Sequence, residues 1–160
     1  MYFITVYGHK INGAIIMGTG QQPRSLIKLG LYLTRFMALV KGWDYRSKFV
    51  NYLVIGQNNI AFKPARTKSD WLTRDDKIVD TYLTDRRIDF IFTLKGFYNL
   101  FSIMLHMNER NQNIPKELPT LLVSGQNDPV GNFGQGVHKT YNIYKSIGMK
   151  NISMKLYEEK

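Results

Sequence analysis

The chain has 160 residues, enough for one domain of ordinary size, and 44% of them are hydrophobic, which excludes wholesale disorder. It has no cysteine, so disulfides, thiolate metal sites and a cysteine nucleophile are excluded. The net charge of +10 comes from 22 Lys+Arg against 12 Asp+Glu, and the cations are scattered and form no dense run. This favours a solvated, basic surface, with weak attraction to a membrane surface as the alternative and no specific nucleic-acid partner.

The first predicted element is a short helix ending at Gly8, with one apolar face made of Tyr2, Phe3, Val6 and Tyr7. This start lacks the basic residues and long apolar run of a signal peptide. No apolar stretch of the sequence approaches the roughly 20 residues that cross a bilayer. We therefore expect a cytoplasmic protein.

A strand and then four helices are predicted next. Ala14–Met17 is a short apolar run between glycines, as in strands buried on both faces of a parallel sheet. Amphipathic helices are predicted from Leu26 to about Gly42, over residues 49–54, and over residues 96–107. Another helix follows Thr73, the predicted N-cap, and its buried stripe is Ile78, Val79, Tyr82 and Leu83.

The last part alternates strand, helix and strand. Leu118–Val123 is a second buried strand, and Ile152–Leu156 alternates as a third. The helix between them ends at Gly148 and carries an apolar stripe of Val137, Tyr141, Tyr144 and Ile147. This order predicts an α/β fold with about three parallel strands and covering helices, and with bare sheet edges.

Asp128 is the candidate functional residue. It comes just after the second strand, and functional groups of open α/β sheets collect at the carboxyl ends of strands. An acid there can accept a hydrogen bond from a histidine Nδ1–H and stabilise the imidazolium formed when the ring acts as a base. The alternative is a loop aspartate that caps a turn through its own backbone.

Three segments carry a resemblance to a known family. LPTLLVSGQNDPVGNFGQGV (118–137), followed by a helix and ISMKLYEE, resembles the late part of α/β-hydrolases of the serine aminopeptidase S33, monoacylglycerol lipase and lysophospholipase type. INGAIIMGTG (11–20) resembles the strand after the nucleophile helix, and KSDWLTRDDKIVDTYLTD (68–85) resembles the cap segment.

The resemblance implies an incomplete α/β-hydrolase fold in one domain. Residues 1–22 would be the end of the nucleophile helix and the following core strand. Residues 23–110 would be a helical cap insertion and a return helix. Residues 111–160 would be a core strand, the acid loop, a helix and the last strand.

The resemblance also implies that Asp128 is the triad acid, separated from its partners. The family's nucleophile lies in a Gly-x-Ser-x-Gly elbow, which is absent from the sequence and is expected upstream of Met1. The catalytic histidine of the family follows the last strand. We expect His9 to face solvent, His106 to be half-buried on a helix, and His138 to lie at a helix start, and none of them to act.

Aromatic and aliphatic residues of the cap would line an acyl-chain pocket, with plain core packing as the alternative; they are Trp71, Leu72, Phe90, Phe92 and Phe97. No cofactor is expected, because the glycines of Gly131–Gly136 do not directly follow a strand as a dinucleotide loop would. No metal is expected, because Asp75, Asp76 and Asp80 are typical of a helix start.

We therefore expect a serine-hydrolase-family polypeptide that acts on acyl esters, lysophospholipids or monoacylglycerols when complete, and that is inactive as this chain alone. The alternative is a non-catalytic binding or partner module that completes a sheet supplied by another chain.

Overall fold

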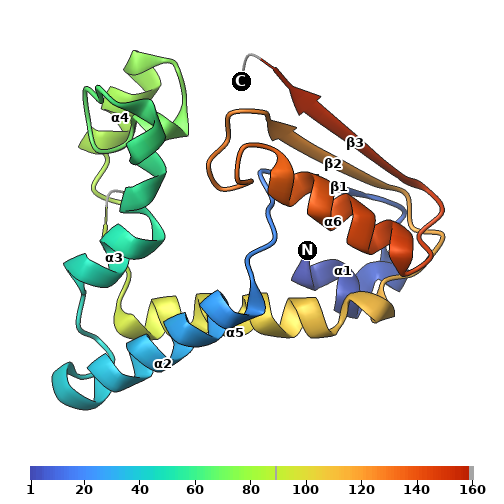
Figure 1. Cartoon of the computed structure of the whole chain (residues 1–160), viewed down its shortest axis with the longest axis horizontal. Coiled ribbons are helices and arrows are strands. Elements are labelled where there is room, and N and C mark those ends of the chain that lie inside the picture. The colour runs from blue at the N-terminus through green and yellow to red at the C-terminus, as the bar shows by residue number, and fades with distance from the viewer. Residues whose placement is uncertain (89, 159–160) are drawn as a thin grey trace. The chain divides into compact units, whose positions relative to one another are not determined.

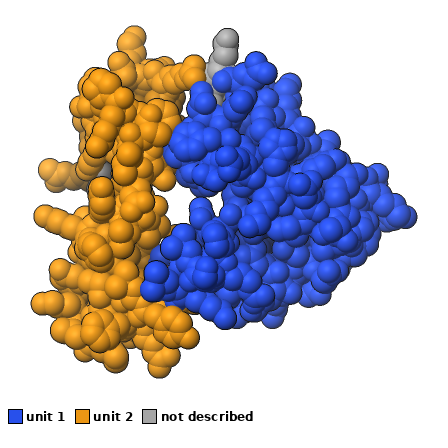
Figure 2. Space-filling view, viewed as in Figure 1, with its two compact units in different colours: residues 1–29, 101–160 blue, residues 30–100 orange. Residues whose placement is uncertain are grey.

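The computed structural model describes residues 1–88 and 90–158. Residues 89, 159 and 160, which fall inside the predicted ranges 23–110 and 111–160, lie outside the described residues. The chain divides into two compact units, drawn in different colours in Figure 2. One unit is Met1–Leu29 with Phe101–Lys160, and it contains the sheet; the other is Gly30–Leu100, and its regular elements are helical.

Three parallel strands form one sheet in the order β1-β2-β3 (Figure 1); they are β1 (Ala14–Met17), β2 (Thr120–Gly125) and β3 (Ile152–Tyr157). The predicted three-stranded parallel sheet is confirmed. β2 begins two residues later than predicted. Leu118 donates its N–H to a turn with Pro115, and Pro119 has no N–H, so the ladder starts where Thr120 donates to Asn151 at 2.8 Å.

The α-helices of the described residues are α1 (Tyr2–Tyr7), α2 (Arg24–Lys41), α3 (Lys48–Val54), α4 (Asp76–Thr84), α5 (Leu94–Glu109) and α6 (Gln135–Ser146). Short 3₁₀ turns lie at Gly8–Lys10, Gly56–Phe62, Asp70–Leu72 and Asn111–Asn113. Within the described ranges, no helix combines the length and the apolar character needed to cross a membrane.

The core of the first unit lies on one face of the sheet. α6 runs along this face and contacts β2 and β3 (Figure 1). Leu122, in the middle of β2, is fully buried there, and burying such a side chain stabilises the fold by about 1.5–3 kcal/mol. The other buried members of this cluster are Ile4, Ile16, Ile114, Leu118, Val137, Tyr144, Met149 and Ile152.

The opposite face of the sheet is bare at β1. Ile15 and Met17 point to that face and are 70% and 75% exposed, whereas Ile16 between them is buried. The prediction that this strand is buried on both faces is therefore wrong. β1 is the outer strand of the sheet, and no described residue covers its second face.

α1 ends directly before Gly8, as predicted. Its aromatic side chains lie largely at the surface: Phe3 and Tyr7 contact each other with their ring centroids 5.2 Å apart, while Ile4 and Thr5 are buried. Gly8 has a right-handed φ of −54°. A Cβ at Gly8 would lie 2.7 Å from Pro115 Cδ, so the close approach of the proline explains this glycine.

The N-cap of α4 is Asp75 and not Thr73. Asp75 Oδ1 accepts the N–H groups of Lys77 at 2.9 Å and of Ile78 at 3.4 Å. Thr73 Oγ1 instead accepts the N–H of Asp75 at 3.3 Å. The helix begins one residue after an acid that reaches its first free amides, and the negative charge suits the positive end of the helix.

Candidate functional site

Asp128 lies at the carboxyl end of the central strand. β2 ends at Gly125, and Asp128 donates its N–H back to the Gly125 carbonyl at 3.2 Å, which closes a tight turn. The Asp128 carbonyl accepts the N–H of Phe133 at 3.0 Å. The main chain of Asp128 is thus held on both sides, as a positioned acid requires.

The side chain of Asp128 is half-buried and has two partners. Its Oδ1 accepts the N–H of Val130 at 2.8 Å, and its Oδ2 accepts the hydroxyl of Ser124 at 3.2 Å. The Val130 bond is the turn cap that the sequence left open as an alternative. A carboxylate has about four acceptor positions, so these two bonds leave capacity for a further donor. Capping the turn and orienting an imidazole are compatible roles.

The loop after Asp128 enters α6 through three consecutive left-handed residues. Asn132, Phe133 and Gly134 have φ values of 49°, 53° and 81°. A left-handed conformation is uncommon for a bulky residue such as phenylalanine and costs about 1–2 kcal/mol. The hydrogen bond from Gly136 N–H to the Gly131 carbonyl, at 2.8 Å, closes the loop behind this turn. The acid therefore sits in a fixed loop.

Glycines let the loop after β1 approach the acid loop. Gly18 has a φ of +57°, and a Cβ there would lie 3.4 Å from Asp128 Oδ2. A Cβ at Gly20 would lie 2.5 Å from the Val130 carbonyl oxygen, and one at Gly136 would lie 3.0 Å from Gly20 Cα. Backbone-to-backbone packing thus fixes both loops at this edge of the sheet.

None of the histidines completes the site within the described part of the chain. His9 is exposed, as predicted, and His138 lies in the first turn of α6, also as predicted. His106 is exposed and not half-buried, and its Nδ1 lies 2.7 Å from the Ser102 carbonyl oxygen on the same helix. The side-chain hydrogen bonds of Asp128 come from Ser124 and Val130, and none comes from a histidine of the described residues.

The predicted pocket residues are partly brought together. Phe92 links Phe90 and Phe97 in an edge-to-face chain, with centroid distances of 5.3 and 5.6 Å. Phe97 is fully buried, whereas Phe90 is exposed. Trp71 is half-buried and Leu72 is exposed, both in one 3₁₀ turn. An acyl-chain pocket at these residues stays a prediction.

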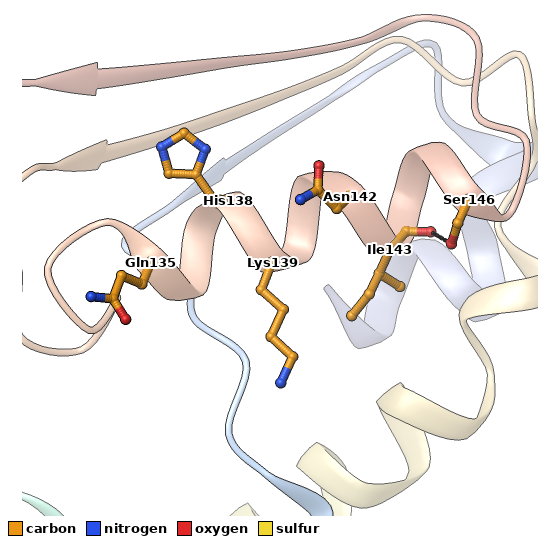
Figure 3. Close-up of a pocket in the computed structure, with 6 residues that line it drawn as sticks. All are labelled: Gln135, His138, Lys139, Asn142, Ile143 and Ser146. Carbon is orange, nitrogen blue, oxygen red and sulfur yellow. Dashed lines mark hydrogen bonds between the residues drawn. The ribbon is translucent and has the colours of Figure 1, made fainter.

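One shallow depression lies on α6 alone. Figure 3 shows its lining side chains spaced along a single helix, with one hydrogen bond among them, from Ser146 Oγ to the Ile143 carbonyl at 2.8 Å. They are Gln135, His138, Lys139, Asn142, Ile143 and Ser146. Because no catalytic group converges on another there, the acid loop remains the candidate site. Across residues 1–88 and 90–158, no three His, Asp or Glu side chains gather as metal ligands.

Ser124 donates a hydrogen bond to the Asp128 carboxylate and was missed by the sequence analysis. It is buried at 5% exposure, and it lies two residues after Leu122 on the same face of β2. Strand periodicity places alternate residues on one face, so the polar residue at this inward position was the available signal.

Comparisons place this geometry among known proteins. The family model described as serine aminopeptidase, S33, matches residues 1–160. A search of curated proteins found no match. The chain is similar to a highly thermostable carboxyl esterase from Bacillus coagulans, whose crystal structure holds glycerol, with 21% identity and a TM-score of 0.85 over 97% of this chain and 51% of the esterase.

A second similar structure is a lipase in an open form. It shares 21% identity with this chain, with a TM-score of 0.73 over 98% of this chain and 51% of the lipase. The chain thus spans about half the length of both solved structures. At this level of identity the likeness concerns the fold, and these neighbours carry about as much chain again beyond the part that matches.

Proposed function

The chain belongs to the serine aminopeptidase S33 family and has an incomplete α/β-hydrolase fold, and from this we propose that it carries the acid of a Ser-His-Asp triad that acts on acyl esters when complete. The acid is Asp128. The observation that carries the proposal is the fixed Asp128 carboxylate at the carboxyl end of β2, with acceptor capacity left for an imidazole N–H.

The role of Asp128 follows from the chemistry of acyl transfer. A serine attacks the ester carbonyl, a histidine takes the serine proton and later gives it to the leaving group, and the acid holds the imidazole in the right tautomer. Within this chain, Ser124 and Val130 hold the carboxylate. The sequence has no Gly-x-Ser-x-Gly elbow, so we propose that this chain alone does not turn over esters. Lysophospholipids and monoacylglycerols are the finer substrate classes we propose, and a cytoplasmic location goes with them.

A chimera tests the role of Asp128. The segments of the Bacillus coagulans carboxyl esterase that lie outside the match would be joined to the corresponding ends of this chain. The chimera would then be assayed with p-nitrophenyl butyrate. Asp128→Asn in the chimera is expected to lower kcat about 10⁴-fold while leaving the melting temperature nearly unchanged. The exposed Asp44→Asn serves as the control. A folded, active chimera that is indifferent to Asp128→Asn would contradict the proposal.

The second proposal is a non-catalytic partner module, and the bare edge of β1 favours it. Ala14 and Gly18 donate their N–H groups toward β2, to Pro119 at 2.8 Å and to Val123 at 2.9 Å. Alternate residues of a parallel strand face opposite neighbours, so Ile15 and Met17 direct their main-chain groups to the free edge. Fast amide exchange at these two residues in the isolated chain supports an open edge; slow exchange and a compact monomer that binds no partner would count against it.

A further inference from the structure

A second depression lies in the first unit, next to the acid loop, and has a volume of about 480 Å³. Three segments form its walls: the loop from β1 into the first turn of α2, the acid loop after β2, and the first turns of α6. Both loops follow the carboxyl ends of strands, which is the edge at which open α/β sheets bind ligands. The polar side chains in the walls are Gln21, Gln22, Asn132, Gln135 and Lys139.

Main-chain contacts hold these walls together. A Cβ at Gly136 would lie 3.0 Å from Gly20 Cα and 3.2 Å from the Gln21 main-chain nitrogen, so α6 and the loop after β1 touch through their backbones. Gly136 also donates its N–H to the Gly131 carbonyl at 2.8 Å, which ties α6 to the acid loop. A depression with fixed walls loses little conformational entropy when a ligand enters, and this favours binding.

The charge of the depression is positive. Of the described residues that line it, only Lys139 is charged. The Lys139 side chain is exposed and forms no ion pair across residues 1–88 and 90–158. Figure 3 shows Lys139 and Gln135 on the same side of α6, with His138 on the opposite side. A cation without an acid beside it in the walls attracts a negatively charged ligand.

Carboxamide side chains supply further hydrogen-bond donors. The side-chain nitrogen of Gln21 is buried and has no hydrogen-bond partner among the described residues. A buried donor in this state costs about 1–3 kcal/mol, and an acceptor on a ligand would recover it. Asn132 Nδ2 donates to Gln135 Oε1 at 3.2 Å, which uses the Gln135 oxygen and leaves the Gln135 nitrogen as a donor. The depression thus combines one cation with several N–H groups.

We propose that this depression binds a small organic phosphate. The three terminal oxygens of the phosphate would accept hydrogen bonds from the Lys139 ammonium and from the side-chain N–H groups of Gln21 and Gln135. Hydroxyl groups on the organic part would pair with the carboxamides of Gln22 and Asn132, because a carboxamide donates and accepts as a hydroxyl does. The inference goes beyond the triad proposal, because it involves neither the Asp128 carboxylate nor turnover.

NMR titration of the isotope-labelled full chain tests this binding. The probes are α-glycerol phosphate, inorganic phosphate and glycerol, compared at one pH and one ionic strength. The main-chain amide signals of Gln21, Asn132 and Lys139 are expected to shift together with glycerol phosphate and to saturate. Inorganic phosphate is expected to bind more weakly at the same signals, because it offers no hydroxyls of a polyol to the carboxamides. Glycerol is expected to bind more weakly still, because it has no charge.

Two variants remove one donor each. Lys139→Gln is expected to weaken the binding of glycerol phosphate about fivefold, which is the upper range for an exposed ion pair. Gln21→Met keeps the length of the side chain but removes its N–H groups, and it is expected to weaken binding about fivefold as well. Gln21→Met also removes a buried nitrogen without a partner, so resistance to urea should stay the same or rise. Loss of binding in this variant would therefore not reflect unfolding.

Matched controls lie in the same unit. Lys145→Gln makes the same charge change on α6, and Gln126→Met makes the same exchange at an exposed glutamine just after β2; both are expected to bind glycerol phosphate like the wild type. Signals that shift all over the basic surface without saturating would overturn the site. Equal affinity for inorganic phosphate would overturn it too, as would variants at Lys139 and Gln21 that bind like their controls.

Discussion

Replacing Asp128 by alanine should destabilise the chain by an amount that its two side-chain partners determine. Ser124 is buried and its hydroxyl donates to Oδ2, so without the carboxylate the hydroxyl becomes a buried donor without this acceptor. Such an orphaned group costs about 1–3 kcal/mol. The Val130 N–H lies at the surface and can donate to water instead, so losing its hydrogen bond to Asp128 adds little to the cost. We expect Asp128→Ala to lower the free energy of unfolding by about 1–2 kcal/mol.

Urea unfolding followed by circular dichroism measures this change, and a double-mutant cycle identifies its source. Ser124→Ala removes the orphaned hydroxyl, so adding Asp128→Ala to it should cost less than Asp128→Ala alone. Asp44→Ala, at an exposed acid with no hydrogen bond to the described residues, should stay within about 0.5 kcal/mol of the wild type. The reasoning fails if Asp128→Ala matches Asp44→Ala, or if the two changes in the cycle simply add.

Three further changes probe the loops, the core and the second unit. Gly20→Ala would place a Cβ 2.5 Å from the Val130 carbonyl and should cost about 1–3 kcal/mol in urea unfolding; a neutral result would contradict the close packing. Tyr144→Phe should be neutral or stabilising by up to about 1 kcal/mol, because the buried hydroxyl has no hydrogen-bond partner among the described residues, and a clear loss of stability would reveal one. The pKa of Asp70 is lowered from its ordinary value of 3.8, mainly by the hydrogen bond from the Thr67 hydroxyl. The ionised Asp70 therefore stabilises the fold above pH 3.8, and this contribution is lost as the pH falls through the pKa of the folded state. Asp70→Asn should flatten this acid limb of the stability curve, and an unchanged limb would refute the assignment.

The strands and longer helices were predictable because their signals are local. Ala14–Met17 is both the predicted and the observed strand, and the stripe from Leu26 onward marks α2. The 3₁₀ turns were missed; three of them have only three residues, and a run that short gives no periodicity to detect. The N-cap of α4 was misplaced by two residues because Thr73 and Asp75 are both capable caps, and only the geometry shows which oxygen reaches the free amides.

Burial was less predictable than secondary structure. An apolar stripe shows that a face exists but not whether anything covers it. In α1 the aromatics Phe3 and Tyr7 stack on each other at the surface, and Ile4 enters the core. Asp128 was identifiable from its place after a strand, whereas the hydrogen bond from Ser124 depends on the turn that brings the two side chains together. A turn of this kind is set by backbone packing between distant loops, which no local pattern encodes.

The exposed apolar face of β1 predicts the kind of partner that this edge of the sheet would fit. The β1 surface has Ile15 and Met17 beside an unpaired strand edge, and the cation on the same face of the sheet, Lys155, lies on β3 at the far side. An edge with free amides and carbonyls is satisfied by another strand, so this surface fits a polypeptide. We therefore expect Ile15→Lys to impair the pairing of β1 with another strand, because it places a charge on the exposed apolar face beside that edge.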